Sequence, residues 1–489
     1  MRHFRRGKLS ILIAGRICTV VAVSVVVLSG CSGRRPGDDA PVAAFSAHLD
    51  RRIPGLMDRY DIPGVAIALV EDGRMVWAGA YGYADVAEGR PMTTRAVCRA
   101  ESISKSVTAW GVMKLVEQGR IDPAAPVSRY LSEVEIDASR FPGDEVTIAR
   151  LLSNSAGMPI GTVGPEVEYA PGAPRPAKRD YLAGETQLVQ APGGGFLYSN
   201  VGFNLLEIVV ENVTGRDFEA YMKDEVLEPL GMRNASYAWE PRMRDLMPTG
   251  YELDGTPVPP YVYPVAGSGG LFADVEDLAR FVSASVSGSG GTSTQLHTPA
   301  VEVPGLFGFA ADAYGYGHFT ETLPDGRRAV WHGGQGHGWM THFHAVPESG
   351  NGVVILTNSQ RSWPFISYVL TDWARWSGAG RVKFGAIVWA SRALRACIAI
   401  IVLLSLAGVY RLGRELIDGR RRFAPFAQVA RGRRAAAAAI GIVIAGGLLW
   451  AVSQPYLFVS WIFPATAGLA GWSLVLAAAV LIAFALLPP

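Results

Sequence analysis

The residues of this sequence best suited to chemistry are a serine and a lysine in the stretch ESISKSVTAWGVMKLVEQGR. Ser102 precedes Lys105 by three residues, and an apolar-periodic run typical of a helix follows, so both side chains fall on one helix face. A serine hydroxyl is a weak nucleophile at neutral pH and needs a base within hydrogen-bond reach. The spacing alone is common, and its alternative interpretation is a polar entry into an amphipathic helix.

Two further short motifs follow along the chain. Tyr198–Asn200 (Tyr-Ser-Asn) precedes an apolar-periodic helix, and His332–Gly334 (His-Gly-Gly) stands at the end of a predicted strand. Tyr-Ser-Asn alone is more typical of a helix entry, because Ser and Asn are good caps. A tyrosine has an ordinary pKa near 10, and we expect the ammonium of Lys105 to lower it. Whether Tyr198 or Lys105 is the formal base stays open, because coupled groups titrate as a unit.

The three motifs together resemble those of the serine β-lactamase and D-alanyl-peptidase superfamily. The branch they resemble contains class C β-lactamases, D-aminopeptidases and related esterases. Three more segments match in the family's order, namely LLSNSAGMP (151–159), EVLEPLGM (225–232) and AGSGGLFADVEDLARF (266–281). The resemblance covers most of residues 42–375.

The resemblance implies a catalytic cycle through an acyl group on Ser102. In that cycle Tyr198 takes the Ser102 proton and later activates the deacylating water. Asn200 holds Lys105 and contacts the substrate amide. The backbone N–H groups of Ser102 and Gln335 form the oxyanion hole that acyl transfer requires.

The third motif departs from the β-lactamase pattern, in which it reads Lys-Thr-Gly. Here His332 replaces the lysine that helps to bind a substrate carboxylate. A histidine is mostly neutral near pH 7, which counts against efficient penicillin hydrolysis and carboxypeptidase action. It favours an aminopeptidase, amidase or esterase. Gly333 and Gly334 are expected to let the substrate backbone approach this strand.

Four histidines near this motif raise the question of a metal site, namely His332, His337, His342 and His344. His342 and His344 alternate on a predicted strand and should face the same side. No carboxylate or cysteine completes a familiar ligand spacing. We therefore expect no metal and no cofactor.

The pattern of elements predicts an α+β fold, with an antiparallel sheet flanked by helices and a mainly helical subdomain beside it. One hairpin is predicted at Asp72-Gly73 and another around Glu348–Gly352, after a strand RRAVWHG. Helices are predicted at 44–60, 107–118, 203–213 and in PFISYVLTDWARW. These elements make up a hydrolase domain at 42–376.

The 489-residue chain is 49% hydrophobic with a formal net charge of +2, and this near-neutral charge argues against a nucleic-acid partner.

The N-terminus has the pattern of an export signal. A basic start is followed by an apolar run ending in LSGC, which resembles the lipobox of bacterial lipoproteins. Residues 1–31 are thus predicted to be a signal with a lipid on Cys31, and 32–41 a linker. Cys98 is then the only cysteine of the exported domain, so no disulfide is expected there.

Three apolar stretches fill residues 385–489, at about 396–410, 435–452 and 466–487, and each approaches the ~20 residues that span a bilayer. The loop 411–434 between the first two carries eight arginines and two acidic residues. The positive-inside rule places this loop in the cytoplasm. The hydrolase domain is then expected on the outer face of a bacterial cytoplasmic membrane.

These features predict an exported, membrane-anchored serine hydrolase that acts on a small peptide, amide or ester. A peptidase or amidase acting on a D-amino-acid-containing or acylated peptide is favoured. The architecture resembles that of prodrug-activating peptidases of nonribosomal-peptide pathways, such as the colibactin-maturation peptidase. The alternatives are an esterase or weak β-lactamase and, in another class, a slowly released β-lactam or cell-wall sensor.

Overall fold

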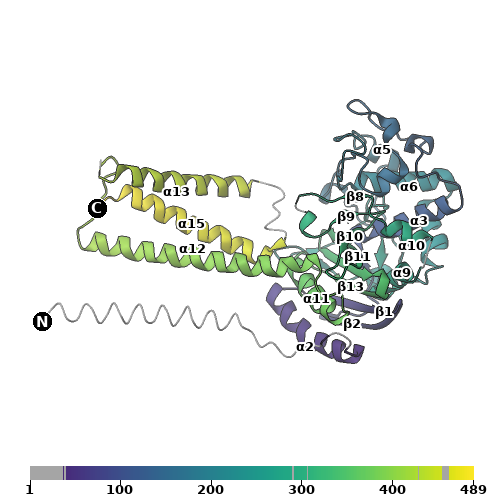
Figure 1. Cartoon of the computed structure of the whole chain (residues 1–489), viewed down its shortest axis with the longest axis horizontal. Helices are drawn as coiled ribbons and strands as arrows, with labels where there is room; N and C mark the ends of the chain where they lie inside the picture. Colours follow the sequence, from purple (N-terminus) through teal and green to yellow (C-terminus); the bar gives the residue numbers. More distant parts are fainter. Residues whose placement is uncertain (1–36, 38–39, 289–290, 306, 428, 454–461) are drawn as a thin grey trace.

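The computed structural model describes residues 37, 40–288, 291–305, 307–427, 429–453 and 462–489. The predicted signal 1–31, its Cys31 and most of the linker 32–41 lie outside these residues. The described chain consists of a catalytic region followed by three long helices (Figure 1).

A nine-stranded sheet forms the centre of the catalytic region, in the order β3-β2-β1-β13-β12-β11-β10-β9-β8. Every pairing in it is antiparallel. Its strands are β1 (Gly64–Glu71), β2 (Arg74–Asp85), β3 (Arg90–Pro91), β8 (Val301–Glu302), β9 (Ala313–Tyr314), β10 (Phe319–Thr322), β11 (Arg328–Gly336), β12 (Trp339–Val346) and β13 (Asn351–Thr357). The predicted α+β class is confirmed.

Both predicted hairpins are present. Asp72 and Gly73 connect β1 to β2 with positive φ angles of 50° and 70°, as a two-residue hairpin turn requires. The turn Pro347–Ser349 leads from β12 to β13. The strand predicted to end near Gly333 runs on to Gly336, because β12 pairs with it over its whole glycine-rich end.

The sheet is buried on both faces. Adjacent residues of β1 belong to different cores: Val65, Ile67 and Leu69 to one, and Ala66, Ala68 and Val70 to the other. The first core includes residues of α2 (Val42–Tyr60) and α11 (Trp363–Trp376). The second includes residues of α9 (Val275–Ser287) and of the helical region. The alanines leave space for α9 to pack closely.

The helical region lies between two short paired strands, β4 (Cys98–Arg99) and β7 (Phe272–Ala273). Its two main helices are α3 (Ser104–Glu117) and α6 (Asn200–Thr214). The shorter elements are α4 (Ile148–Leu152), α5 (Lys178–Leu182), α7 (Phe218–Met222), α8 (Met243–Leu246) and the strand pair β5 (Gly250–Tyr251) and β6 (Pro257–Val258); α10 (Thr292–His297) follows α9. This region positions most of the site residues.

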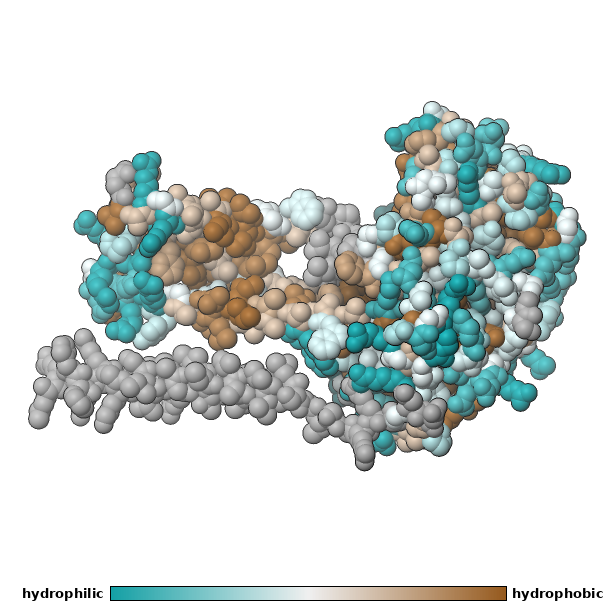
Figure 2. Space-filling model, in the orientation of Figure 1, coloured by the Kyte–Doolittle hydropathy of each residue, from teal (hydrophilic) through white to brown (hydrophobic). Residues whose placement is uncertain are grey.

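Three C-terminal helices are long and apolar enough to cross a membrane. They are α12 (Ala386–Ile417), α13 (Arg431–Val452) and α15 (Pro464–Leu486). Figure 1 shows them side by side, extending away from the catalytic region. Their outer surface is a hydrophobic band that ends in hydrophilic residues at the far tip (Figure 2). Apolar side chains exposed in this way fit a lipid environment.

Candidate active site

The nucleophile candidate lies where a turn enters a helix. Ser102 belongs to the 3₁₀ turn Glu101–Ile103, which leads directly into α3. Lys105 lies in the first turn of α3, and its Nζ donates a hydrogen bond to Ser102 Oγ at 3.2 Å. The structure therefore brings the serine and the lysine onto one face, as their spacing predicts.

The Lys105 side chain is completely buried and held by two further acceptors. Its Nζ donates to Asn200 Oδ1 at 2.7 Å and to the Ser268 carbonyl at 2.8 Å. Burial lowers the pKa of Lys105 to about 7, while the carboxylate of Glu101 opposes this shift. At neutral pH a large fraction of Lys105 is thus a neutral amine, which is the form that accepts a proton.

Tyr198 lies against this lysine, with its ring centroid 4.9 Å from Lys105 Nζ. Burial raises the pKa of Tyr198 above its ordinary value, although a hydrogen bond with Ser102 opposes the shift. The expectation that Lys105 lowers this pKa is wrong, because the buried phenolate loses its hydration and the adjacent lysine is itself partly neutral. The directions of the two pKa shifts favour Lys105 over Tyr198 as the proton acceptor near neutral pH.

The start of α6 fixes both Tyr198 and Asn200. Ser199 caps the helix, since its Oγ accepts a hydrogen bond from Gly202 N at 2.9 Å. Asn154 Oδ1 accepts from Ser199 N at 3.0 Å, and Asn154 O accepts from the backbone N–H of residue 197 at 2.7 Å. The segment 151–159 therefore positions the Tyr-Ser-Asn motif.

His332 lies on β11 beside Tyr198, with ring centroids 6.2 Å apart. Its Nδ1 contacts the Gly333 carbonyl at 2.9 Å, which accepts only, so Nδ1 carries the proton. Its Nε2 then accepts from Tyr314 Oη at 3.1 Å. Burial and the nearby charge of Lys105 lower the pKa of His332 well below its ordinary value. His332 is a neutral side chain with both ring nitrogens engaged.

The end of β11 forms one wall beside the nucleophile turn. β10 pairs only with Arg328–Trp331, so the following residues extend past it. A Cβ at Gly334 would lie 2.3 Å from the Ala100 carbonyl and 2.2 Å from Thr341 Oγ1. At Gly333 a Cβ would meet the Trp363 ring at 2.8 Å. The two glycines thus allow close packing within the protein, in addition to the predicted approach of substrate.

Gln335 follows these glycines on the same strand. Its side-chain Oε1 accepts a hydrogen bond from Trp363 Nε1 at 3.1 Å. This contact occupies the side chain, and the predicted contribution of Gln335 to an oxyanion hole involves only its backbone N–H.

The segment 266–281 was matched to the family from its sequence, but the hydrogen bond from Lys105 to its Ser268 carbonyl was not predicted. Glu207, buried in α6, holds the loop that contains Ser268: its Oε2 accepts from the backbone N–H groups of Ala266 and Gly267 at 2.7 and 2.5 Å. Its Oε1 lies 2.6 Å from Lys178 Nζ. A carboxylate inside the apolar run NLLEIVVEN was the available signal, because buried charges are rare unless they are paired.

The other histidines lie outside the catalytic contacts. His337 contacts Glu168 Oε2 at 2.7 Å and Glu252 Oε1 at 2.8 Å. His342 and His344 face the same side of β12, as predicted, with Nε2 and Nδ1 3.4 Å apart. In the part of the chain that the structure describes, no group of three or more His, Cys, Asp or Glu side chains is arranged to hold a metal ion.

An antiparallel sheet with a serine and a buried lysine at the start of a helix beside it defines the class of serine β-lactamases and penicillin-binding proteins. A sequence model of the Beta-lactamase family matches residues 49–368. The chain belongs to this family of serine hydrolases and related binding proteins.

Two curated relatives show the range of this similarity. The chain is 24% identical over 316 residues to Protein flp of Staphylococcus aureus (strain N315), covering 63% of this chain and 62% of that protein. It is 25% identical over 342 residues to Penicillin-binding protein 4* of Bacillus subtilis (strain 168), covering 66% of this chain and 74% of the relative. The chain thus spans less than two thirds of the length of Protein flp.

Solved structures give the same result for the fold. The octameric penicillin-binding protein homologue from Pyrococcus abyssi is similar with a TM-score of 0.57 and 27% identity, over 66% of this chain and 77% of the other. The Beta-Lactamase/D-Alanine Carboxypeptidase from Pseudomonas syringae is similar with a TM-score of 0.55 and 18% identity, over 64% and 94%. The second likeness concerns the fold alone.

Proposed function

We propose that this protein is an exported, membrane-anchored serine hydrolase that cleaves an amide or ester through an acyl group on Ser102. The observation that carries the proposal is the fully buried Lys105, whose Nζ lies 3.2 Å from Ser102 Oγ and whose pKa burial lowers to about 7. A base poised near neutral pH beside a serine hydroxyl is what acyl transfer needs.

The proposed reaction begins when the neutral Lys105 amine takes the proton of Ser102 Oγ. The oxygen attacks the substrate carbonyl carbon, and the backbone N–H groups of Ser102 and Gln335 stabilise the resulting oxyanion. The carbon–nitrogen or carbon–oxygen bond then breaks, and the leaving group takes the proton from Lys105 through the Tyr198 hydroxyl. Water attacks the acyl group, gives one proton back to Ser102 and releases the acid.

His332 supports the choice of substrate class. A neutral histidine whose two nitrogens bond within the protein offers no positive charge to a substrate carboxylate. We therefore favour a peptidase or amidase over an enzyme that recognises a free carboxyl end.

Aromatic side chains beside Tyr198 support an apolar group on the substrate. The rings of Phe196 and Phe307 lie 6.5 and 6.1 Å from the Tyr198 ring, and Phe309 of the same loop is 73% exposed. An acylated or D-amino-acid-containing peptide is the substrate that we propose, because exposed aromatic groups at a site bind apolar groups.

The test compares hydrolysis of D- and L-aminoacyl p-nitroanilides, short acyl p-nitrophenyl esters and nitrocefin by the full-length protein in detergent. Faster cleavage of the D-aminoacyl amide than of its L enantiomer supports the proposed peptidase. Equal rates on the two enantiomers count against it, and preference for the ester or for nitrocefin indicates the esterase or β-lactamase alternatives. A stable penicillin adduct without turnover indicates a sensor.

Ser102→Ala must abolish every one of these activities. Ser106→Ala is the matched control, since this hydroxyl on the same helix donates to the Gly317 carbonyl at 2.5 Å and not to the lysine. It should retain turnover. Loss of activity in both variants would mean that the test reports folding and not the nucleophile.

We extend the proposal to the cell. Export by the segment 1–31 with a lipid on Cys31 would place the site on the outer face of the membrane, where an exported acylated precursor could be cleaved. Metabolites of a strain carrying Ser102→Ala, compared with the parent strain, should then contain an accumulated acylated precursor. Identical metabolite profiles would reject a role in prodrug activation.

A further inference from the structure

The residue immediately before the nucleophile has an unusual backbone conformation. Glu101 has a φ of +50°, in the left-handed region that non-glycine residues seldom occupy. Such a conformation is energetically unfavourable and persists only where the surrounding structure fixes it. The Glu101 side chain is buried, at 2% exposure. The contacts of this side chain hold a glutamate in a backbone conformation that glycine would adopt more easily.

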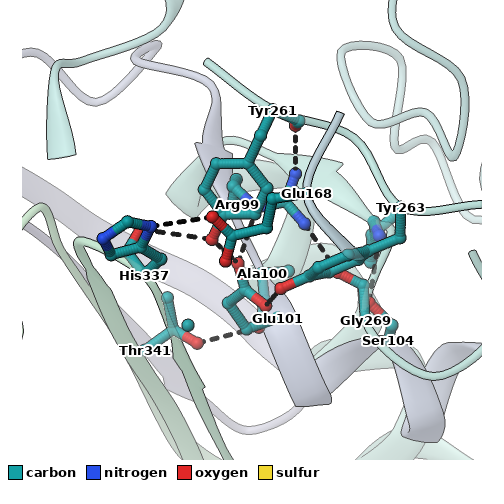
Figure 3. Close-up of polar contacts among 12 residues, drawn as sticks. Arg99, Ala100, Glu101, Ser104, Glu168, Tyr261, Tyr263, Gly269, His337 and Thr341 are labelled. Carbon is teal, nitrogen blue, oxygen red and sulfur yellow. Dashed lines mark hydrogen bonds and ion pairs between the residues drawn. The ribbon is translucent and has the colours of Figure 1, made fainter. Parts of the chain in front are cut away.

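Three donors enclose the Glu101 carboxylate (Figure 3). Arg99 Nε and Tyr261 Oη donate to its Oε1 at 2.6 and 3.0 Å, and Tyr263 Oη donates to its Oε2 at 3.0 Å. Arg99 is itself fixed, since its Nη1 donates to the Tyr261 carbonyl at 2.7 Å. We call Arg99, Tyr261 and Tyr263 the carboxylate cage. Both oxygens of Glu101 are engaged, so the side chain has one defined position.

The backbone just before Glu101 is fixed as well. Ala100 N donates to the Leu271 carbonyl at 2.8 Å, and Thr341 Oγ1 donates to the Ala100 carbonyl at 2.8 Å. With Ala100 and the Glu101 side chain both held, the peptide group between Glu101 and Ser102 has one orientation. The N–H of that peptide group belongs to Ser102.

Glu101 also contacts the strand that carries Gln335. A Cβ on Gly336 would lie 2.2 Å from Glu101 Cδ, and one on Gly334 would lie 3.0 Å from Glu101 Cβ. The glycines on both sides of Gln335 thus pack directly against Glu101. One side chain therefore touches both segments from which the two oxyanion donors are expected.

We propose that Glu101 is the positioning residue of the oxyanion hole, because its caged carboxylate orients the Ser102 N–H and sets the spacing of that N–H from Gln335. The inference rests on the proposed acyl transfer at Ser102 and deepens it. Glu101 acts through these donors and does not touch the substrate.

The charge of Glu101 provides a second, independent readout. Its carboxylate raises the pKa of Lys105 against the effect of burial. A neutral residue at position 101 therefore lowers the pKa of Lys105 further, and the acid limb of the rate moves to lower pH. The titratable groups that face Glu101 or its cage are Arg99, Tyr261, Tyr263, Glu168 and His337. The titratable groups that face Lys105 are Tyr198 and His332.

The experiment measures the rate at which a fluorophosphonate probe labels full-length protein in detergent, from pH 5 to 10, together with kcat and KM for a p-nitrophenyl ester. Glu101→Gln keeps the size of the side chain and removes its charge. We expect labelling and kcat to fall about 100-fold, as for a displaced catalytic group, with KM nearly unchanged and the acid limb at lower pH. Tyr263→Phe removes one cage donor and should slow labelling about tenfold without moving the limb.

Asp372→Asn is the matched control. Asp372 pairs with Arg52 and His48 in a buried contact between α2 and α11, so its loss should lower stability and leave the labelling rate and the pH profile as in the wild type. Labelling rates of Glu101→Gln and Tyr263→Phe within threefold of the wild type, or an unmoved acid limb in Glu101→Gln, would overturn the proposal. Should the wild type label without hydrolysing any substrate, the hydrolase function fails while labelling still decides the role of Glu101.

Discussion

At the scale of single residues, the site depends on how burial shifts the pKa values of Lys105 and Tyr198. Desolvation disfavours the charged form of each group, so it lowers the pKa of the lysine to about 7 and raises that of the tyrosine. The two shifts move in opposite directions. They leave Lys105 as the group that can accept a proton at neutral pH and Tyr198 as a hydrogen-bond donor.

The pH dependence of acylation follows from the neutral form of Lys105. Because the amine must be unprotonated, the fluorophosphonate labelling rate should rise as pH rises through about 7 and then reach a plateau. Label incorporation over pH 5 to 10 gives the profile. An acid limb above pH 9 would instead identify the phenolate of Tyr198 as the base.

Substitution of this lysine tests the same point without a pH profile. Lys105→Arg keeps a positive charge but stays protonated, and we expect labelling to fall about 10²- to 10⁴-fold, the usual contribution of a general base. Retained labelling would show that Lys105 acts only through its charge.

At the scale of elements, the site forms where α3, α6, β11 and the loop 266–270 meet. The turn into α3 and α3 itself supply the serine and the lysine, and the segment that enters α6 supplies the tyrosine and the asparagine. β11 supplies the glycine-rich wall, and the loop supplies the Ser268 carbonyl. The close contact between β11 and the nucleophile turn has no room for a side chain at Gly334.

Gly334→Ala should therefore destabilise the protein by about 1–3 kcal/mol, the usual cost of overpacking, and strongly reduce labelling of Ser102. Gly184→Ala is the control, because a Cβ there meets nothing within 4 Å; its effect should stay within about 0.5 kcal/mol. Thermal unfolding and labelling measure both variants. Unchanged labelling in Gly334→Ala would contradict the packing described for this strand.

The sequence predicted those parts of the site that depend on local spacing. Ser102 and Lys105 are three residues apart where a turn enters a helix, and Asn200 begins a helix that follows a capping serine. Burial and long-range contacts could not be predicted from local spacing. Glu101 directly precedes Ser102 in the sequence, but its role depends on contacts with tyrosines about 160 positions away. The direction of the Tyr198 pKa shift likewise depends on packing that no local pattern reports.

At the scale of the whole molecule, the catalytic region is joined to the first apolar helix by direct contacts. Lys383, just before α12, donates its backbone N–H to Glu321 Oε2 at 2.6 Å, and its Nζ pairs with Asp312. Phe384 is buried against Trp331, with ring centroids 5.7 Å apart. These contacts hold the start of α12 against the sheet, so the site is expected to lie near the membrane surface.

The topology proposed here places Glu88 outside the membrane and Arg422 of the basic loop inside. A membrane-impermeant maleimide applied to intact cells should label Glu88→Cys and not Arg422→Cys, and both after permeabilisation. The parent chain gives the background from its own cysteines. Labelling of Arg422→Cys in intact cells would reverse the orientation inferred from the positive-inside rule.

The central claim is that Ser102 becomes acylated. The most direct measurement is peptide mass mapping of full-length protein after reaction with a fluorophosphonate probe at pH 8. We predict a single adduct on the peptide containing Ser102, absent from Ser102→Ala and greatly reduced in Lys105→Arg. An adduct on another residue, or no adduct on active wild-type protein, would contradict the account.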